Sequence, residues 1–308
     1  MGRSNLVAAL AVTTIACGGP PLEIPSSEAL MPINGTELYV KRMGAGEPII
    51  VVHGGPVLEH GYLLPHLAPL AESYELIFYD QRLSGRSAGT VDSSSVRLAT
   101  FVDDIEALRR ALGLDRFHLM AHSWGGLLAM HYAVRYGDNL QSLVLLNSMS
   151  ASSALWREEE TVLAQRLTEE DKAKGAAIRE TEAFANQDPE AIAQLLQVSF
   201  KPQFHDRTLA NELVLYVPDD YPNRRRQFGY MMVDLLSFDI HDALAGVAVP
   251  TLIIYGSDEP GAELGGAALR RQLQRSTFVV IRDAGHFPFI EQPREFVREV
   301  TSFLEEQR

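Results

Sequence analysis

The sequence predicts an α/β protein whose mostly parallel central sheet carries helices on both faces. Short apolar segments with the β-branched content of buried strands lie near 49–53, 75–80, 117–122 and 142–147. Segments with helical periodicity alternate with them, near 59–71, 95–112 and 125–136. This alternation is typical of parallel sheets, because each crossover helix covers one face of the sheet.

The first predicted element of this fold is a β-hairpin over residues 31–42. Apolar residues flank an Asn34-Gly35 pair, and Asn-Gly is favoured in two-residue hairpin turns because both residues tolerate positive φ. We therefore expect the folded part of the chain to begin near residue 29.

The residues before the hairpin have the pattern of an export signal. One positive charge precedes an apolar stretch over 6–16, which is too short to span a bilayer. The stretch ends in Thr14-Ile15-Ala16-Cys17, similar to a bacterial lipoprotein signal with Cys17 as the lipidated residue. Residues 1–17 are thus predicted to be the signal, and the Pro-, Gly- and Ser-rich residues 18–28 a tether. We expect export, to a membrane surface or the periplasm; the alternatives are cleavage without lipidation and an N-terminal core helix.

The strand near 49–53 opens into His53-Gly54-Gly55-Pro56. A tight glycine loop at this place can supply a backbone N–H group to an oxyanion, and Gly55 is the candidate donor. The alternative is an ordinary glycine turn.

The predicted helix over 96–112 has an apolar face and is followed by Gly113, a residue suited to a helix C-terminus. The apolar face consists of Leu98, Phe101, Val102, Ile105, Leu108 and Leu112.

The strand near 117–122 runs into Ala121-His122-Ser123-Trp124-Gly125 and then into a helical pattern. A sharp strand-to-helix turn needs small residues two positions before and after its serine, because the two backbones approach closely there. Ala121 and Gly125 meet that requirement. Ser123 is therefore the candidate nucleophile, and Trp124 supplies the candidate second oxyanion donor through its backbone N–H.

Three motifs in order, His-Gly-Gly-Pro, Asp80-Gln81-Arg82 with the Gly85 and Ser87 that follow, and Ser123-Trp124-Gly125-Gly126, resemble the α/β-hydrolase superfamily. Within it they resemble the proline iminopeptidase-like serine hydrolases. The resemblance extends from about residue 30 to the end of the chain, apart from a middle insertion. Val57 and Leu83 stand where these relatives usually have glycine, beside the expected mouth of the active site.

The resemblance implies a catalytic triad in the order serine, acid, histidine. His286, in the Ala-Gly-His sequence after a predicted strand, is the expected general base. Either Asp258 or Glu259 is the expected acid. The usual register after a strand-ending glycine, here Gly256, favours Glu259, whereas the commoner residue type favours Asp258.

Between the sixth and seventh predicted strands, residues 150–242 have helical rather than strand patterns. Thr168 and Asp188 have the sequence context of helix starts. We expect this insertion to form a helical cap over Ser123, with the catalytic domain formed by 29–149 and 243–308. In iminopeptidases of this family, cap carboxylates pair with the substrate's amino terminus. The candidates are Glu182, Glu212, Asp219, Asp220 and Asp234.

Two charge runs of the insertion, Glu158-Glu159-Glu160 and Arg224-Arg225-Arg226, are typical of solvated helix faces. They are therefore weaker candidates for the substrate pocket.

Composition excludes several other functions. The 308 residues carry a formal net charge of −13, which disfavours a nucleic-acid surface. No metal or other cofactor is expected: the histidines lack the spacing of a zinc helix, Cys17 is the only cysteine, and no phosphate-binding glycine motif is present. The expected partners are a short peptide or other small molecule and, through the lipid anchor alone, a membrane.

The function favoured by these features is a serine hydrolase that works through an acyl-enzyme and releases N-terminal residues from small peptides. A carboxylesterase or lactonase with the same catalytic residues is the alternative. A non-catalytic surface protein that binds a ligand is a more remote one.

Overall fold

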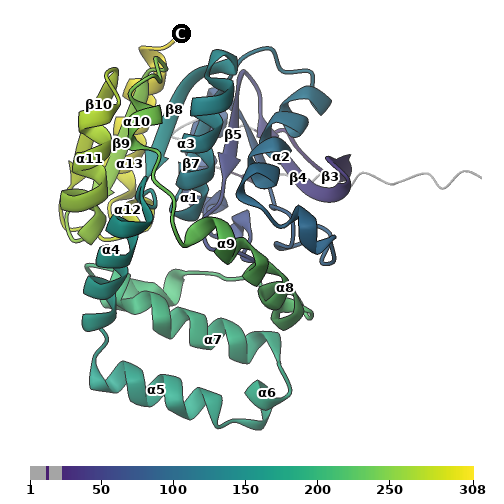
Figure 1. Ribbon diagram of the computed structural model, residues 1–308, viewed down its shortest axis with the longest axis vertical. Coiled ribbons are helices and arrows are strands. Elements are labelled where there is room, and N and C mark those ends of the chain that lie inside the picture. Colours follow the sequence, from purple (N-terminus) through teal and green to yellow (C-terminus); the bar gives the residue numbers. More distant parts are fainter. Residues whose placement is uncertain (1–11, 14–22) are drawn as a thin grey trace, which may run out of the picture.

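The computed structural model describes residues 12–13 and 23–308 (Figure 1). A pair of two-residue strands, β1 (Val12–Thr13) and β2 (Glu23–Ile24), precedes the main sheet. Cys17 and most of the predicted signal and tether lie outside the described residues, so those assignments stay predictions. Among the described residues no helix is both long and apolar enough to cross a bilayer.

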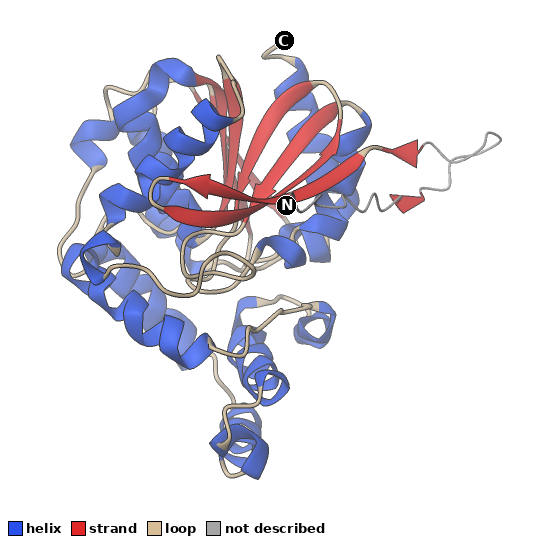
Figure 2. Ribbon diagram, turned by 90° about the vertical axis from the view of Figure 1, so that its right-hand side faces the viewer, coloured by secondary structure: helices blue, strands red, loops and turns tan. Residues whose placement is uncertain are grey.

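The centre of the fold is an eight-stranded sheet with the order β10-β9-β8-β7-β5-β6-β4-β3 (Figure 2). Its strands are β3 (Ser26–Ile33), β4 (Thr36–Gly44), β5 (Glu47–Val52), β6 (Tyr74–Tyr79), β7 (Phe117–His122), β8 (Leu140–Leu146), β9 (Thr251–Gly256) and β10 (Ser276–Ile281). The six strands from β10 to β6 are parallel, and β4 and β3 add an antiparallel hairpin at one edge. The predicted hairpin with its turn at Asn34-Gly35 and the mostly parallel sheet are therefore confirmed.

One boundary differs from the prediction. Strand β3 begins at Ser26 and pairs with β4 from Ser26↔Met43 onward. Residues 26–28 therefore belong to the sheet rather than to the predicted tether. The alternating side chains here are mostly exposed, as suits an edge strand, and this is why composition alone assigned them to a linker.

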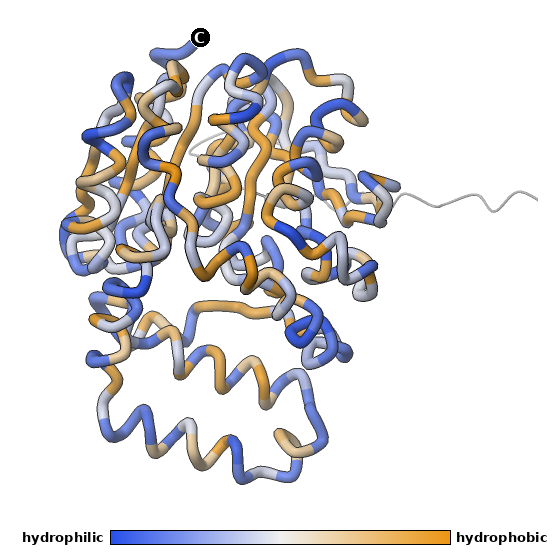
Figure 3. The backbone as a smooth tube through the Cα atoms, viewed as in Figure 1, coloured by the Kyte–Doolittle hydropathy of each residue, from blue (hydrophilic) through white to orange (hydrophobic). Residues whose placement is uncertain are grey.

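The two faces of the sheet are covered by different helices. On β5, Ile50 and Val52 pack in one core with α2 (Leu98–Ala111), α3 (Trp124–Tyr136), α10 (His241–Leu244) and α11 (Ala267–Gln272). Ile49 and Val51 face the other core, formed with α1 (Leu64–Leu67), α12 (Pro288–Glu291) and α13 (Pro293–Glu305). Successive strand residues point to opposite faces, so both faces of the strands are apolar, as their hydropathy in Figure 3 shows. The predicted apolar face of α2 is buried as expected.

The chain between β8 and β9 forms a helical segment at one end of the sheet, the end from which β8 leads into α4 (Figure 1). We call residues 153–235 the helical segment. Its α-helices are α4 (Ser153–Gln165), α5 (Glu169–Arg179), α6 (Glu182–Ala185), α7 (Pro189–Phe200), α8 (Tyr221–Phe228) and α9 (Met232–Leu235). The predicted helix starts are confirmed, because Thr168 caps α5 in a reciprocal capping box with Asp171 and Asp188 caps α7.

Candidate active site

The position of the site follows from the sheet topology. The chain leaves β5 toward β6 on one side and then returns to place β7 on the other side of β5. A crevice forms outside the carboxyl ends of parallel strands where the strand order reverses, and ligands bind there. The loop after β5 holds Gly54 and Gly55, and the turn after β7 holds Ser123. The fold therefore brings these two sequence motifs to the same place.

Ser123 occupies a strained turn between β7 and α3. Its φ and ψ are 54° and −122°. Residues other than glycine rarely adopt this backbone conformation, which costs about 1–3 kcal/mol. A Cβ atom on Gly125 would lie 2.5 Å from the carbonyl oxygen of Val52, and one on Gly126 would collide with Ser148. The glycines after the serine are thus required, because α3 starts against the end of β5 at Gly125 and against the loop after β8 at Gly126.

His286 and Glu259 form a hydrogen-bonded pair beside this turn. The imidazole Nδ1 lies 2.9 Å from Oε2 of Glu259, and the carboxylate is buried. Asp258 points elsewhere: its Oδ2 lies 2.7 Å from Nδ1 of His205, and both side chains are exposed. Of the two candidate acids, the structure brings Glu259 to the imidazole. The hydrogen bond to Asp258 raises the pKa of His205.

The loop after β5 lies directly against Ser123. A Cβ atom on Gly54 would be 2.7 Å from the Cβ atom of Ser123, and Gly55 adopts a positive φ of 61°. The N–H group of Gly54 donates to the Tyr62 hydroxyl at 2.7 Å. That leaves Gly55 as the candidate oxyanion donor of this loop. The N–H of Trp124 is the first of helix α3, a position with no acceptor inside its own helix.

Gln81 links the two candidate oxyanion segments. Its side-chain NH₂ donates to the carbonyl of His53 at 2.7 Å, and its Oε1 accepts from the indole N–H of Trp124 at 2.8 Å. Gln81 of the Asp-Gln-Arg motif therefore holds the loop after β5 and the start of α3 in position relative to each other. Arg82 serves the scaffold, since its guanidinium forms a fully buried ion pair with Asp104.

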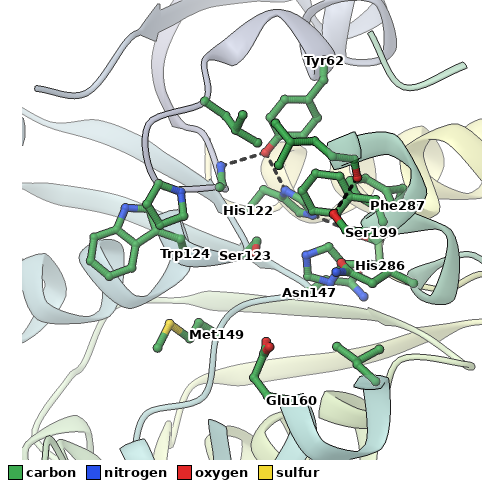
Figure 4. Close-up of a pocket in the computed structure, with 18 of the residues that line it drawn as sticks. Tyr62, His122, Ser123, Trp124, Asn147, Met149, Glu160, Ser199, His286 and Phe287 are labelled. Atoms are coloured by element: carbon green, nitrogen blue, oxygen red, sulfur yellow. Dashed lines mark hydrogen bonds between the residues drawn. The ribbon is translucent and has the colours of Figure 1, made fainter. Parts of the chain in front are cut away.

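Behind Ser123 runs a chain of hydrogen bonds that the sequence did not indicate (Figure 4). The hydroxyl of Tyr62 accepts from Gly54 N–H and lies 2.7 Å from Nδ1 of His122; Nε2 of His122 lies 3.0 Å from the carbonyl oxygen of His286. A carbonyl can only accept, so Nε2 carries the proton and Nδ1 accepts from Tyr62. Burial holds the pKa of His122 well below its usual value and keeps it neutral. These hydrogen bonds connect the loop after β5, strand β7 and the loop that carries His286.

A cavity of about 510 Å³ contains Ser123, His286 and Glu259 and is lined on its other side by the helical segment. Most of its lining is apolar, including Trp156, Leu196, Phe200 and Phe228. Asn147 also lines it. The Asn147 amide donates to the Gly285 carbonyl at 3.0 Å, while its buried Oδ1 accepts no hydrogen bond from the described residues.

The five carboxylates proposed from sequence as substrate ligands do not line this cavity. Asp234 pairs with Arg97 and caps the first turn of α2, and Asp220 pairs with Arg224. Sequence position within the insertion did not reveal which helix face is turned toward the cavity. The five carboxylates that are absent from the cavity lining are Glu182, Glu212, Asp219, Asp220 and Asp234.

Side chains of both charge runs, in contrast, line the cavity. The interpretation of these runs as solvated helix faces is therefore wrong for some of their residues. Glu159 and Glu160 line it from α4, and Arg225 lines it from α8. Glu159 is buried, its Oε1 accepts from the Ser150 hydroxyl and from Gly265 N–H, and burial raises its pKa to about 7. Desolvation also raises the pKa of Glu160, although this residue is exposed to solvent; it is drawn near His286 in Figure 4.

Another buried group, Glu59, His60 and Asp80, has the composition of a metal site. His60 and Asp80 are already hydrogen-bonded to each other, whereas Oε2 of Glu59 has no hydrogen-bond partner among the described residues. Asp80 accepts from His60 Nδ1 at 2.6 Å and from the backbone N–H of Arg86 at 2.8 Å, and the Arg86 guanidinium lies 3.6 Å from Glu59. A positive charge so close disfavours a cation. We interpret the group as a structural support for the loop after β6.

Val57 and Leu83, which stand where the relatives usually have glycine, keep the positive φ that glycine readily adopts. Val57 has φ 70° and Leu83 has φ 65°. Both side chains are buried, with exposed fractions of 1% and 0%. Positive φ is unfavourable for these residues, and especially so for β-branched valine. Apolar packing compensates for this strain.

The fold and this geometry define an enzyme class, and comparison with known proteins identifies it. Residues 47–293 match the model of the alpha/beta hydrolase fold family, so the chain belongs to that family and is a hydrolase. The proline iminopeptidase of Lactobacillus helveticus is 29% identical over 296 residues, covering 91% of this chain and 98% of that protein. The crystal structure of the Mycobacterium smegmatis proline iminopeptidase superposes with a TM-score of 0.67 at 25% identity, covering 91% of this chain and 98% of that one. Est816, described as an N-acyl homoserine lactone degrading enzyme, shares the fold at 22% identity and a TM-score of 0.61, covering 87% of this chain and 97% of that one.

Proposed function

We propose that this protein is a serine aminopeptidase of the proline iminopeptidase type, in which Ser123, His286 and Glu259 form the catalytic triad. The observation that carries the peptidase assignment is Glu160, a carboxylate in the same mostly apolar cavity as Ser123 and His286. An acid in such a cavity favours a ligand that brings a positive charge, as the free amino terminus of a peptide does.

The mechanism follows from the positions of these groups. Ser123 Oγ attacks the carbonyl carbon of the first peptide bond while His286 accepts its proton, and Glu259 holds the imidazole through Nδ1. Backbone N–H groups of Gly55 and Trp124 stabilise the oxyanion. The C–N bond breaks as His286 returns the proton to the leaving amine. A water molecule, deprotonated by His286, then hydrolyses the acyl-enzyme, so one water is consumed for each amino acid and shortened peptide released.

The Glu160 carboxylate is suited to accept from the substrate's amino terminus. A protonated N-terminal proline offers N–H donors, and Glu160 lines the cavity. The helical segment then acts as a cap that selects for a free amino terminus. This assignment replaces the five cap carboxylates that the sequence suggested.

The test is a comparison of proline arylamide with a short-chain aryl ester. We expect the wild type to cleave the arylamide, and Glu160→Gln to lower the ratio of arylamide to ester kcat/KM by about tenfold or more, the size expected for a lost charge-assisted contact. Glu158→Gln is the matched control, because Glu158 belongs to the same charge run but does not line the cavity. Ester turnover without arylamide cleavage would instead favour the carboxylesterase or lactonase alternative.

Labelling with a fluorophosphonate probe tests for catalysis itself. Folded wild-type protein is expected to be labelled and Ser123→Ala is not. Equal labelling of the two proteins, or none of either, would favour the ligand-binding alternative.

We further propose that the mature enzyme is attached to a membrane surface through lipidated Cys17. The lipoprotein-like sequence before the tether supports this. Cys17→Ala is expected to move the protein from the membrane fraction to the soluble fraction, and an unchanged distribution would contradict the proposal.

A further inference from the structure

The cavity lining includes a charged side chain that the proposed reaction does not use, Arg225 of α8. Tyr221, Arg225 and Phe228 lie on one face of α8, since residues spaced by three or four share a helix face. All three line the cavity. The ring of Phe228 lies 5.6 Å from that of Trp124 in an edge-to-face contact. This contact fixes the face that carries Arg225 beside the nucleophile turn.

The neighbouring arginines of the same run have other partners. Arg224 is buried, pairs with Asp220 at 2.5 Å and donates to the carbonyls of Gly85 and Ser87. Arg226 donates to the side chain of Asn223 at 2.6 Å. Arg225 forms no ion pair with any carboxylate of residues 23–308. Its guanidinium is therefore available to an anion in the cavity.

The charges that line the cavity are of both signs. Glu259 is engaged by His286 and Glu159 by its hydrogen-bond donors. Among the described residues that line the cavity, this leaves one acidic side chain, Glu160 on α4, and one arginine, Arg225 on α8. The rest of the lining is mostly apolar. Such a cavity suits a ligand with a positive group at one end, a negative group at the other and an apolar body.

Building on the aminopeptidase function proposed above, we propose that Arg225 binds the C-terminal carboxylate of the substrate and makes the enzyme selective for short peptides. The amino terminus is held at Glu160 and the carboxylate at Arg225, with the scissile carbonyl at Ser123 between them. An extended residue spans about 3.5 Å, so each added residue moves the carboxylate farther from the amine. Guanidinium binds carboxylate through parallel N–H donors, which adds directional selectivity.

The experiment compares proline-alanine dipeptide with its C-terminal amide, which lacks the negative charge. For the wild type we expect kcat/KM to favour the free dipeptide by about tenfold, mainly through KM. Arg225→Ala is expected to bring that ratio close to one. Arg226→Ala is the matched control and keeps the wild-type ratio, because its side chain does not line the cavity. High salt is expected to reduce the preference, since Arg225 is exposed to solvent.

The possible results distinguish a failure of this inference from a failure of the proposed aminopeptidase function. A ratio near one in the wild type, or a ratio that Arg225→Ala leaves unchanged, overturns the carboxylate site even if proline arylamide is cleaved. If folded wild-type protein cleaves neither the arylamide nor the peptides, the aminopeptidase function is wrong and the inference is lost with it. A preference for the free carboxylate that does not weaken as the peptide is lengthened would also contradict the proposed selectivity.

Discussion

Replacing Tyr62 by phenylalanine removes one oxygen atom from the centre of the hydrogen-bonded chain behind Ser123. That oxygen accepts from Gly54 N–H and donates to Nδ1 of His122, both at 2.7 Å. Tyr62 is buried, and so is His122. Water therefore has little room to replace the missing partner, and one donor and one acceptor are left unsatisfied.

The expected loss of stability follows from these two groups. An unsatisfied buried polar group costs about 1–3 kcal/mol, while the removed hydroxyl no longer has to be desolvated. We expect the free energy of unfolding to fall by about 2–3 kcal/mol. Activity is affected as well, because Gly54 no longer anchors the loop that carries Gly55. Loss of an oxyanion donor costs about 10²–10³ in turnover, and a displaced donor costs less, so we expect an approximately tenfold lower kcat.

Urea unfolding measures the first effect. The second is measured by the rate of fluorophosphonate labelling, which reports on Ser123 whatever the natural substrate is. Tyr79→Phe is the matched control, because the Tyr79 hydroxyl is buried and has no hydrogen-bond partner among the described residues. Its removal is expected to be neutral or stabilising. Equal effects of the two substitutions, or wild-type labelling of Tyr62→Phe, would refute the role given to this chain.

Three further predictions concern the acids and the buried ion pair. Glu259→Gln should lower kcat by about 10³–10⁴, as loss of the orienting acid does elsewhere, whereas Asp258→Asn should keep kcat near wild type; the reverse result would reassign the triad acid. Burial raises the pKa of Glu159 from 4.5 to about 7, so the folded state holds a proton that the unfolded state loses, and stability should fall by about 3 kcal/mol as pH rises through this interval. Glu159→Gln should remove that dependence in urea unfolding at pH 5 and pH 8. Arg82→Met should cost about 3–5 kcal/mol by leaving Asp104 unpaired, and adding Asp104→Leu should restore most of the stability; additive losses would argue against the ion pair.

The elements that the sequence predicted are those whose signals are local. Asn34-Gly35 specifies its hairpin turn, the strands are short apolar runs, and the caps of α5 and α7 are readable from Thr168 and Asp188. Ser123 was nominated in the same way, because a sharp turn leaves a short sequence signature, whereas His286 was expected from the Ala-Gly-His sequence and the family resemblance. The sequence left the acid open between two adjacent carboxylates. Side-chain direction in a loop has no periodicity, and only the fold turns Glu259 toward the imidazole and Asp258 toward His205.

The residues that the sequence missed depend on contacts between distant segments. Tyr62, His122 and the carbonyl of His286 come from three parts of the chain, and no motif links them. The charges that line the cavity were misjudged for a different reason. A run of three like charges on a helix has members on different faces, so composition cannot say which of them faces solvent.

The cavity-lining charges bear on how one fold serves different substrates. The turn at Ser123 and the His286–Glu259 pair lie on strand ends fixed by the sheet, and in the mechanism proposed above they supply the reaction whatever the acyl group is. Glu160 and Arg225 come from α4 and α8 of the helical segment, outside the sheet. Exchanging the signs of these two side chains by Glu160→Lys and Arg225→Glu would leave the triad contacts in place. If the helical segment selects the substrate by charge, this double variant should lose dipeptide cleavage while still being labelled by the fluorophosphonate probe; dipeptide cleavage at the wild-type rate would show that selectivity lies elsewhere.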